Sequence, residues 1–169
     1  MVTLFLIRHA KSDWNDPAMA DFDRPLNERG KRNAPFMGKK LVEKGEKPEL
    51  LVSSTAKRAF STAKRIAKEL NYEESKIVRV DELYHAPVEA WLKVVNAFDI
   101  TQAKSIMCFG HNNGITEFVN YLTKGNIANM PTCSIAKIQF NFDKWAMVSG
   151  GTGELINFDY PKRYTENLR

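Results

Sequence analysis

Residues 1–16 read Met1-Val2-Thr3-Leu4-Phe5-Leu6-Ile7-Arg8-His9-Ala10-Lys11-Ser12-Asp13-Trp14-Asn15-Asp16, and this stretch decides the fold. Positions 2–7 form a short apolar run without a polar face, which is typical of a strand buried on both sides in the middle of a parallel sheet. The run ends at Arg8-His9, and a polar loop follows. In open α/β sheets, ligands bind beyond the carboxyl ends of the strands. The sequence therefore predicts that Arg8 and His9 lie where such folds carry out their chemistry.

Composition and charge are those of an ordinary globular protein. The 169 residues are 43% hydrophobic and 27% charged, which predicts a single domain over 1–169 with a real core. A net charge of +5 weakly favours anionic partners. The sequence contains no run of about five like charges, so binding to nucleic acid is not expected. No apolar stretch approaches the roughly 18 residues of a membrane span, and no signal peptide is visible, so a cytoplasmic location is expected. Cys108 and Cys133 are expected to be buried free thiols. The oligomeric state is not predicted.

Strand and helix patterns alternate along most of the chain. Further strands are predicted at 50–53, 77–80 and 105–109, each followed by a helical pattern. From Ser134 the apolar period becomes two, which predicts a half-exposed strand, and 145–148 and 155–158 are expected to extend it in antiparallel fashion. Residues 159–169 are expected to be a mobile polar tail. We predict an α/β fold: a three-layer α/β/α sandwich with a mostly parallel central sheet and an antiparallel edge extension.

Several residues mark the expected helix ends. Asn27 is a plausible N-cap, and Pro35 should kink the helix that follows or mark its true start. Ser54-Thr55 is expected to cap the next helix, which carries Arg58 in its first turn, off the apolar stripe and free of the core. Gly45 and Gly125 are expected to end the first and last of these helices.

Four side chains recur at strand ends or helix starts: Arg8, His9, Arg58 and His111. Two arginines and two histidines at one crevice suit a tetrahedral dianion, because a guanidinium bonds two phosphate oxygens at once. A largely neutral imidazole can attack phosphorus, so His9 or His111 is a candidate nucleophile. Arg8, Arg58 and a protonated His111 would neutralise the transferring group without a metal or cofactor.

The same residues resemble a known family. Arg8-His9-Ala10-Lys11-Ser12-Asp13-Trp14-Asn15 resembles the R-H-G-x-S-x-W-N signature of the histidine phosphatase (phosphoglycerate mutase-like) superfamily. Residues 53–63 resemble its S-S-x-x-x-R-A-x-x-T-A block, and Gly110-His111-Asn112 resembles its G-H-N/G block. The three blocks fall in the family's order over nearly the whole chain. The short length, Ala10 and the Asp23-Arg24-Pro25-Leu26 segment are most similar to the SixA-type phosphohistidine phosphatase branch.

This resemblance implies the role of each residue. His9 would be the phosphorylated nucleophile, with Arg8, Arg58 and His111 completing the phosphate pocket. Ser12 and Asn15 match positions near the phosphate, although either could be a simple turn residue. The substrate would be a phosphorylated protein, in particular a protein phosphohistidine, or a small phosphoester.

Two departures from the family pattern bear on the chemistry. Ala10 replaces a glycine, which matters only if that position needs a positive φ. Larger members carry a glutamate proton donor where His85 stands here; Glu82, Asp13 and Asp23 are nearby but match no motif. Without a donor, an alkoxide leaving group is difficult to expel. Because an imidazole leaving group needs less help, a phosphohistidine substrate is favoured.

Other functions remain as alternatives. A small-molecule phosphomonoesterase or mutase of the same superfamily is the enzymatic alternative, and a non-catalytic phospho-ligand binding module is the alternative from another class. Residues 149–153 are rich in glycine but lack the lysine and following helix of a P-loop. A zinc site built from His9, His85, His111 and a cysteine has no metal-type spacing to support it.

Overall fold

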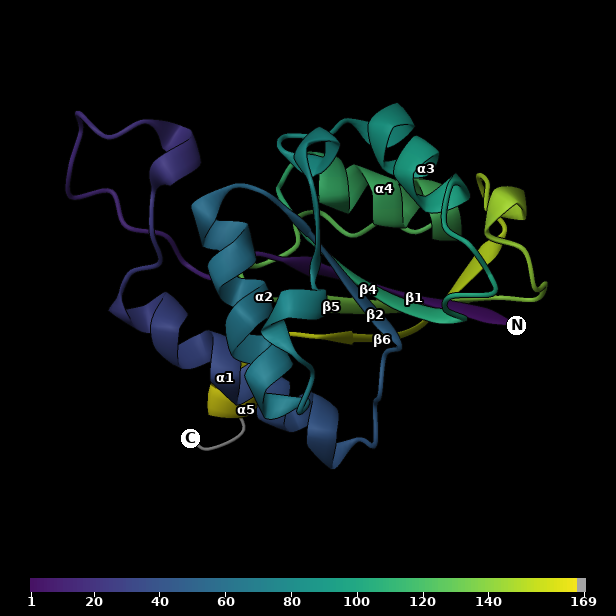
Figure 1. Cartoon of the computed structure of the whole chain (residues 1–169), viewed down its shortest axis with the longest axis horizontal. Helices are drawn as coiled ribbons and strands as arrows, with labels where there is room; N and C mark the ends of the chain where they lie inside the picture. Colours follow the sequence, from purple (N-terminus) through teal and green to yellow (C-terminus); the bar gives the residue numbers. More distant parts are fainter. Residues whose placement is uncertain (167–169) are drawn as a thin grey trace.

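The computed structural model describes residues 1–166. Within that range the chain forms six strands and five α-helices (Figure 1). The strands are β1 (Val2–Arg8), β2 (Leu50–Ser54), β3 (Val78–Val80), β4 (Ser105–Gly110), β5 (Ile135–Phe140) and β6 (Gly153–Asp159). The helices are α1 (Glu28–Glu43), α2 (Lys57–Glu69), α3 (Val88–Asn96), α4 (Gly114–Thr123) and α5 (Pro161–Glu166).

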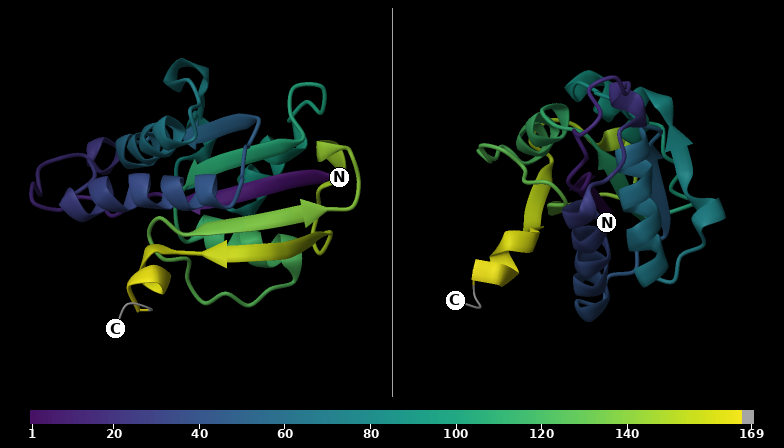
Figure 2. Two further views of the ribbon diagram at one scale, coloured as in Figure 1. Left: turned by 90° about the horizontal axis from the view of Figure 1, so that it is seen from below. Right: turned by 90° about the vertical axis from the view of Figure 1, so that its left-hand side faces the viewer.

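The six strands form one sheet in the order β3-β2-β4-β1-β5-β6. Strand β1 pairs in parallel with β4, with Arg8 opposite Gly110, and antiparallel with β5. Strand β6 continues the antiparallel edge (Figure 2). The predicted α/β fold, mostly parallel with an antiparallel extension, is confirmed. One detail is new: β1 is central, but it lies at the boundary between the parallel and antiparallel parts of the sheet.

Helices cover both faces of the sheet, α1 and α2 on one side and α3 and α4 on the other (Figure 1). Because successive side chains of a strand point to opposite faces, β1 contributes to two cores. Leu4 and Leu6 pack with α3 and α4, and Phe5 and Ile7 pack with α1 and α2; none is more than 2% exposed. The apolar run at 2–7 is therefore buried on both faces, and it fixes the place where His9 leaves the sheet.

Residues 145–148 differ from expectation. They were expected to extend the sheet, but Trp145–Met147 form a 3-10 helix, η4. The buried indole of Trp145 donates a hydrogen bond to Ala103 O at 2.8 Å, and Asn96 Nδ2 donates to Trp145 O and to Val148 O, each at 2.9 Å. These contacts hold the segment near α3 and the loop before β4, away from the sheet edge.

Residues 159–166, expected to belong to a mobile polar tail, are instead ordered in the end of β6 and in α5. Asp159 ends β6, is only 3% exposed, and accepts a hydrogen bond from Lys44 Nζ at 2.8 Å. Helix α5 follows and lies beside α1 (Figure 1). Residues 167–169, the remainder of that prediction, lie outside the described residues.

The helix ends agree in part with the sequence. Asn27 caps α1, because its Oδ1 accepts from Gly30 N at 2.8 Å, so the helix starts well before Pro35. Gly45 follows α1 with a φ of 73°, as predicted. Helix α2 begins only at Lys57, after Ala56, so Ser54-Thr55 is not its cap. Helix α4 ends at Thr123, and the next residue, Lys124, takes the left-handed conformation with a φ of 54°, so Gly125 is not the left-handed position.

Two expectations about the whole chain can be compared with the structure. Cys108 and Cys133 are free and buried, as predicted, and burial raises the pKa of Cys133 to about 12. Over residues 1–166, every helix is too short or too polar to cross a membrane.

Candidate active site

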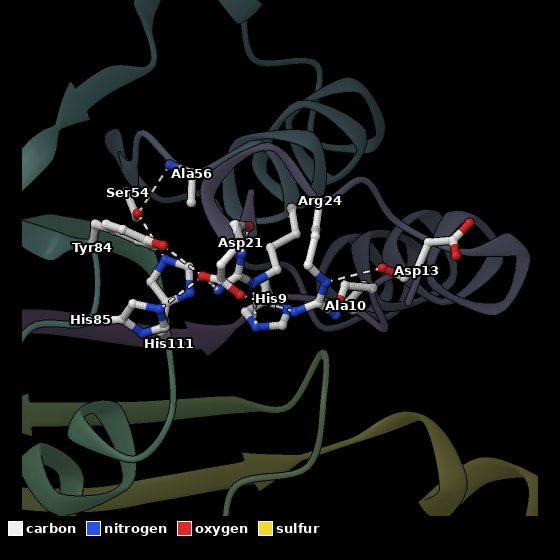
Figure 3. A network of polar contacts seen from close by, with 12 residues as sticks. His9, Ala10, Asp13, Asp21, Arg24, Ser54, Ala56, Tyr84, His85 and His111 are labelled. Atoms are coloured by element: carbon white, nitrogen blue, oxygen red, sulfur yellow. Dashed lines mark hydrogen bonds and ion pairs between the residues drawn. The ribbon is translucent and has the colours of Figure 1, made fainter. Parts of the chain in front are cut away.

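Buried polar side chains from separate elements meet at the carboxyl end of the sheet (Figure 3). His9 follows β1, His111 follows β4, Ser54 ends β2, and Arg58 lies in the first turn of α2. His9, the most exposed of them, is only 8% exposed. The ring centroids of His9 and His111 are 5.3 Å apart, and Arg58 Nε donates to His9 Nε2 at 3.3 Å. Three of the four predicted phosphate-pocket residues therefore form one cluster.

Local contacts fix the tautomer of His9. Its Nδ1 lies 2.7 Å from Ala10 O, and a carbonyl oxygen can only accept, so Nδ1 carries the proton. Burial, helped by the nearby positive charges of Arg58 and Arg8, lowers the pKa of His9 to about 3. The ring is therefore neutral at pH 7, with its lone pair on Nε2. Ala10 needs no positive φ, so the alanine causes no strain at this position.

His111 is also neutral in the ligand-free protein. Burial, with the neighbouring His9 and Arg58, lowers its pKa to about 2, so the protonated His111 expected beside a transferring phosphoryl group is not the form of the ligand-free protein. Its Nε2 lies 2.8 Å from Ser54 Oγ, while Nδ1 is buried without a hydrogen-bond partner among the described residues. When the Ser54 hydroxyl donates to Nε2, the ring proton sits on Nδ1 and can be donated to an oxyanion.

Asp21, in the 3-10 helix η1 (Asp21–Asp23), is the hub of the site's charge network, and sequence reasoning assigned it no role. Its Oδ2 accepts from Arg58 Nη2 at 3.0 Å and from Tyr84 Oη at 2.6 Å, and lies 3.0 Å from His85 Nε2. Its Oδ1 accepts from Arg24 Nη1 at 3.0 Å. Although burial raises the pKa of Asp21, the hydrogen bonds from Tyr84, His85 and Arg58 hold it well below its usual value. The ionised carboxylate of Asp21 thus accepts hydrogen bonds from the guanidinium groups of Arg58 and Arg24, which could otherwise bind phosphate oxygens.

The two loop residues predicted near the phosphate have different fates. Ser12 is buried and accepts a hydrogen bond from Arg24 Nη2 at 2.5 Å, so it belongs to the network around Asp21. Asn15 is exposed, and its backbone N–H donates to Asp13 Oδ1 at 2.7 Å, as in a simple turn. Among the described residues, no hydrogen bond joins the Asn15 side chain to the site.

His85 does reach the site, from the loop before α3. Its ring centroid is 5.1 Å from that of His111, and it pairs with Asp21 while keeping about half of its side chain exposed. His85 has a φ of 49°, which is rare for a residue with a Cβ. Ala86, the residue after His85, lies directly against α4. A Cβ on Gly114, the first residue of that helix, would lie 1.8 Å from Ala86 O. This glycine lets the His85 loop approach the helix that follows His111.

Arg8 is the one predicted phosphate-pocket residue whose guanidinium makes no hydrogen bond to the cluster among the described residues. Its Nη1 donates to Met130 O at 2.7 Å, whereas its Nε is buried and has no hydrogen-bond partner in the described part of the chain. Its positive charge still acts on His9, whose pKa it helps to lower. Arg8 therefore stands beside the cluster as a nearby charge, with an unused N–H donor.

The residues that sequence reasoning missed lie in or next to one-turn 3-10 helices within the connections between strands and helices. Asp21 precedes the Asp23-Arg24-Pro25-Leu26 segment, which served only as a mark of the branch, and Arg24 lies within it. Tyr84 precedes the histidine that replaced the expected glutamate. Loops have no periodicity that predicts which side chain turns inward, so only that similarity could have pointed to them. Within residues 1–166, no three His, Cys, Asp or Glu side chains are placed so that they could hold a metal ion.

Comparison with known proteins agrees with this geometry. Residues 4–91 match the family model of the histidine phosphatase superfamily, branch 1. The chain belongs to this superfamily. In this histidine phosphatase superfamily member the matched range includes most of β1 and all of α1, β2 and α2, and hence His9 and Arg58. His111 lies beyond it, so its assignment to the site depends on the geometry.

Individual relatives place the chain within the superfamily. A candidate phosphohistidine phosphatase SixA from Agrobacterium tumefaciens has a solved structure that is 28% identical, with a TM-score of 0.80 over 95% of this chain and 98% of that one. An uncharacterised chloroplastic protein of Arabidopsis thaliana is 29% identical over 84% of this chain and 68% of its own. Phosphoserine phosphatase 1 of Hydrogenobacter thermophilus is 38% identical over 50% of this chain, which corresponds to 40% of that enzyme.

Proposed function

We propose that the protein is a phosphatase that works through a covalent phosphoryl intermediate on His9, and that its substrate is a protein phosphohistidine. The observation that carries this proposal is the state of His9: a neutral, buried ring, held by Ala10 O, whose Nε2 lone pair faces Arg58. A nucleophile of this kind needs no base to remove a proton before it attacks.

The reaction would take two steps. His9 Nε2 attacks phosphorus, so that a new P–N bond forms while the bond to the leaving group breaks and the leaving group takes up a proton. Water then attacks the phosphorus of phospho-His9, the P–N bond breaks, inorganic phosphate leaves, and the proton of the water passes to phosphate or solvent. Arg58, Arg8 and the Nδ1–H of His111 would hold the equatorial oxygens in both steps. Because the arginines supply positive charge, we propose that no metal ion takes part.

The available proton donors favour phosphohistidine over alkyl phosphates. Glu82 is exposed and makes no side-chain hydrogen bond among the described residues, and Asp13 accepts from its own loop. Asp21 is ionised, so it has no proton to give. Among the described residues, His85, which lies 3.0 Å from Asp21 Oδ2 and beside the ring of His111, is the side chain best placed to protonate a leaving group. An imidazole leaving group depends less on this help than an alkoxide does. The similarity to a candidate SixA protein supports the same substrate.

The test is a direct comparison of substrates and intermediates. The protein is incubated with a labelled phosphohistidine peptide and a matched phosphoserine peptide, and samples are quenched in alkali, which preserves phosphohistidine. Wild type should carry acid-labile label and turn over phosphohistidine faster, whereas His9→Gln should carry none. The His85→Gln variant is the matched control: it should still become labelled, and it should lose more turnover with phosphoserine than with phosphohistidine. Full phosphatase activity in His9→Gln would refute the mechanism.

A small-molecule phosphomonoesterase is the second candidate, favoured by the similarity to a phosphoserine phosphatase over half of this chain. In that case free phosphoserine should be hydrolysed faster than either peptide. A mutase would return the phosphoryl group to the same substrate without release of phosphate. A binding module would bind the phosphopeptide and never become labelled.

A further inference from the structure

A basic depression lies next to the site, because Arg8 and Lys11, which line it, come immediately before and two residues after His9 in the chain. This cavity of about 340 Å³, here called the basic pocket, is lined by Arg8, Lys11, Arg29 and Lys162, with Thr132, Tyr160 and two prolines completing its wall. Among the described residues, no acidic side chain contributes to the lining. The volume falls within the usual range of ligand pockets.

The parts of the basic pocket are held in place by backbone contacts. Asn27 N donates to Lys11 O at 3.0 Å, and a Cβ on Gly30 would lie 2.2 Å from the same oxygen, so the start of α1 is pressed against the Lys11 backbone. On the opposite wall, Cys133 N is 3.0 Å from both Arg8 O and His9 O. The pocket is therefore attached rigidly to the strand end that carries His9.

The charges of the basic pocket take part in no ion pair with the described residues. Over residues 1–166, no ion pair involves Arg8, Lys11 or Arg29. Within the described part of the chain, the Arg8 guanidinium donates one hydrogen bond, to Met130 O, and its Nε is buried without a hydrogen-bond partner. Gathered positive charge of this kind raises the local concentration of anions and speeds their association.

The basic pocket is close enough to His9 to contact the same substrate molecule. Successive Cα atoms are about 3.8 Å apart, so the Cα atoms of His9 and Lys11, two residues apart, are separated by at most about 7.6 Å. An extended peptide advances roughly 3.3 Å per residue. A side chain one to three residues from a bound phosphohistidine can therefore enter the pocket. Lys11, Arg29 and Lys162 are exposed at its rim, which suits a solvated carboxylate better than an enclosed phosphate.

We propose that the basic pocket binds an acidic side chain of the phosphoprotein substrate, located within three residues of its phosphohistidine. This inference rests on the proposed phosphatase activity and adds a sequence preference to it. Rim charges act mainly on association rate and salt dependence, so the preference should appear in kcat/KM and weaken as salt is added.

The test uses two phosphohistidine peptides that differ only in flanking glutamates or glutamines, with phosphoramidate as a small substrate that reports on the His9 site. Wild type should prefer the acidic peptide by roughly five- to tenfold in kcat/KM at low salt, as expected for two exposed ion pairs. In Arg29→Gln/Lys162→Gln this ratio should fall to near one. The control Arg32→Gln/Lys39→Gln removes the same charge from exposed positions of α1 outside the pocket, and should keep the wild-type ratio.

The outcomes separate this inference from the proposed function. If wild type hydrolyses both peptides equally, or if the control variant loses the preference as fully, the basic pocket does not select acidic substrates. A preference for a small bisphosphorylated compound over the acidic peptide, lost in the pocket variant, would assign the pocket to a second phosphate and overturn the peptide proposal. If phosphoramidate and both peptides are inert with wild type, the proposed phosphatase activity itself fails.

Discussion

Asp21 provides the sharpest test of the site, because its carboxylate competes with phosphate for the same donors. The Asp21→Asn variant keeps the shape of the side chain but removes the charge that holds Arg58 Nη2 at 3.0 Å. In the wild type, an incoming phosphate must displace this carboxylate before it can use Arg58. We therefore expect Asp21→Asn to bind inorganic phosphate and its analogue tungstate more tightly than wild type.

The size of the effect follows from one charged hydrogen bond. Hydrogen bonds to charged groups contribute about 1.5–3 kcal/mol, and the Asp21 side chain is 40% exposed, so solvent screening favours the lower end of that range. Since about 1.4 kcal/mol corresponds to a factor of ten in Kd, tungstate should bind roughly tenfold more tightly. The ligand-free variant should also be less stable, because buried Arg58 loses its partner.

This loss of stability has a defined pH dependence. The pKa of Asp21 is lower in the folded protein than its ordinary value of 3.8, so the wild-type carboxylate contributes stability above that pH and loses it as pH falls further. The difference in unfolding free energy between wild type and Asp21→Asn should therefore be constant near pH 7 and shrink below about pH 4.

The assay is calorimetric titration with tungstate at pH 7, alongside urea unfolding of each protein. The matched control is Asp23→Asn, because Asp23 lies in the same 3-10 helix but is exposed and makes no side-chain hydrogen bond among residues 1–166. The control should bind tungstate like wild type. If folded Asp21→Asn binds tungstate no more tightly than wild type, the carboxylate is not a competitor and the reasoning is wrong.

Three further predictions concern the elements that position the site. Burial lowers the pKa of His9 to about 3 and that of His111 to about 2, so as pH falls the unfolded chain takes up protons on these histidines before the folded protein does. The free energy of unfolding should therefore decrease as pH falls from about 6.5 and level off near pH 2–3. Urea unfolding at several pH values should show a flatter profile for His111→Asn, and an unchanged profile would contradict this. Ser54→Ala should reduce kcat for phosphoramidate roughly tenfold with little change in KM, since His111 Nε2 loses its hydrogen-bond partner. Ser54→Thr keeps a hydroxyl and should therefore keep the wild-type kcat. Equal losses of kcat in both variants would contradict this role of the Ser54 hydroxyl. Gly114→Ala should cost about 1–3 kcal/mol in urea unfolding, because the new methyl meets Ala86 O; unchanged stability would show that the His85 loop can yield.

Much of the fold follows from patterns that depend only on neighbouring residues. The apolar run at 2–7 is buried on both faces, and the helical stripe of α2 lies in the core, because these burials recur at fixed spacing along one element. Segment 145–148, whose apolar pattern predicted a strand of the sheet, does not join it, because hydrogen bonds from Asn96 and to Ala103 hold it near α3 and the loop before β4. Such contacts join residues that are far apart in the sequence, and no local period predicts them.

For the candidate site, the sequence by itself determined that His9, Arg58 and His111 would converge. Strand ends and helix starts of a parallel sheet open onto the same edge, so a residue's place in its own element was enough. Only the tertiary structure decided the state of those groups. Burial makes both histidines neutral, Ala10 O leaves the lone pair of His9 on Nε2, and Asp21 covers Arg58. Charge state and hydrogen-bond partner depend on which atoms surround a group in space, and those atoms come from loops whose course is set by the packed core.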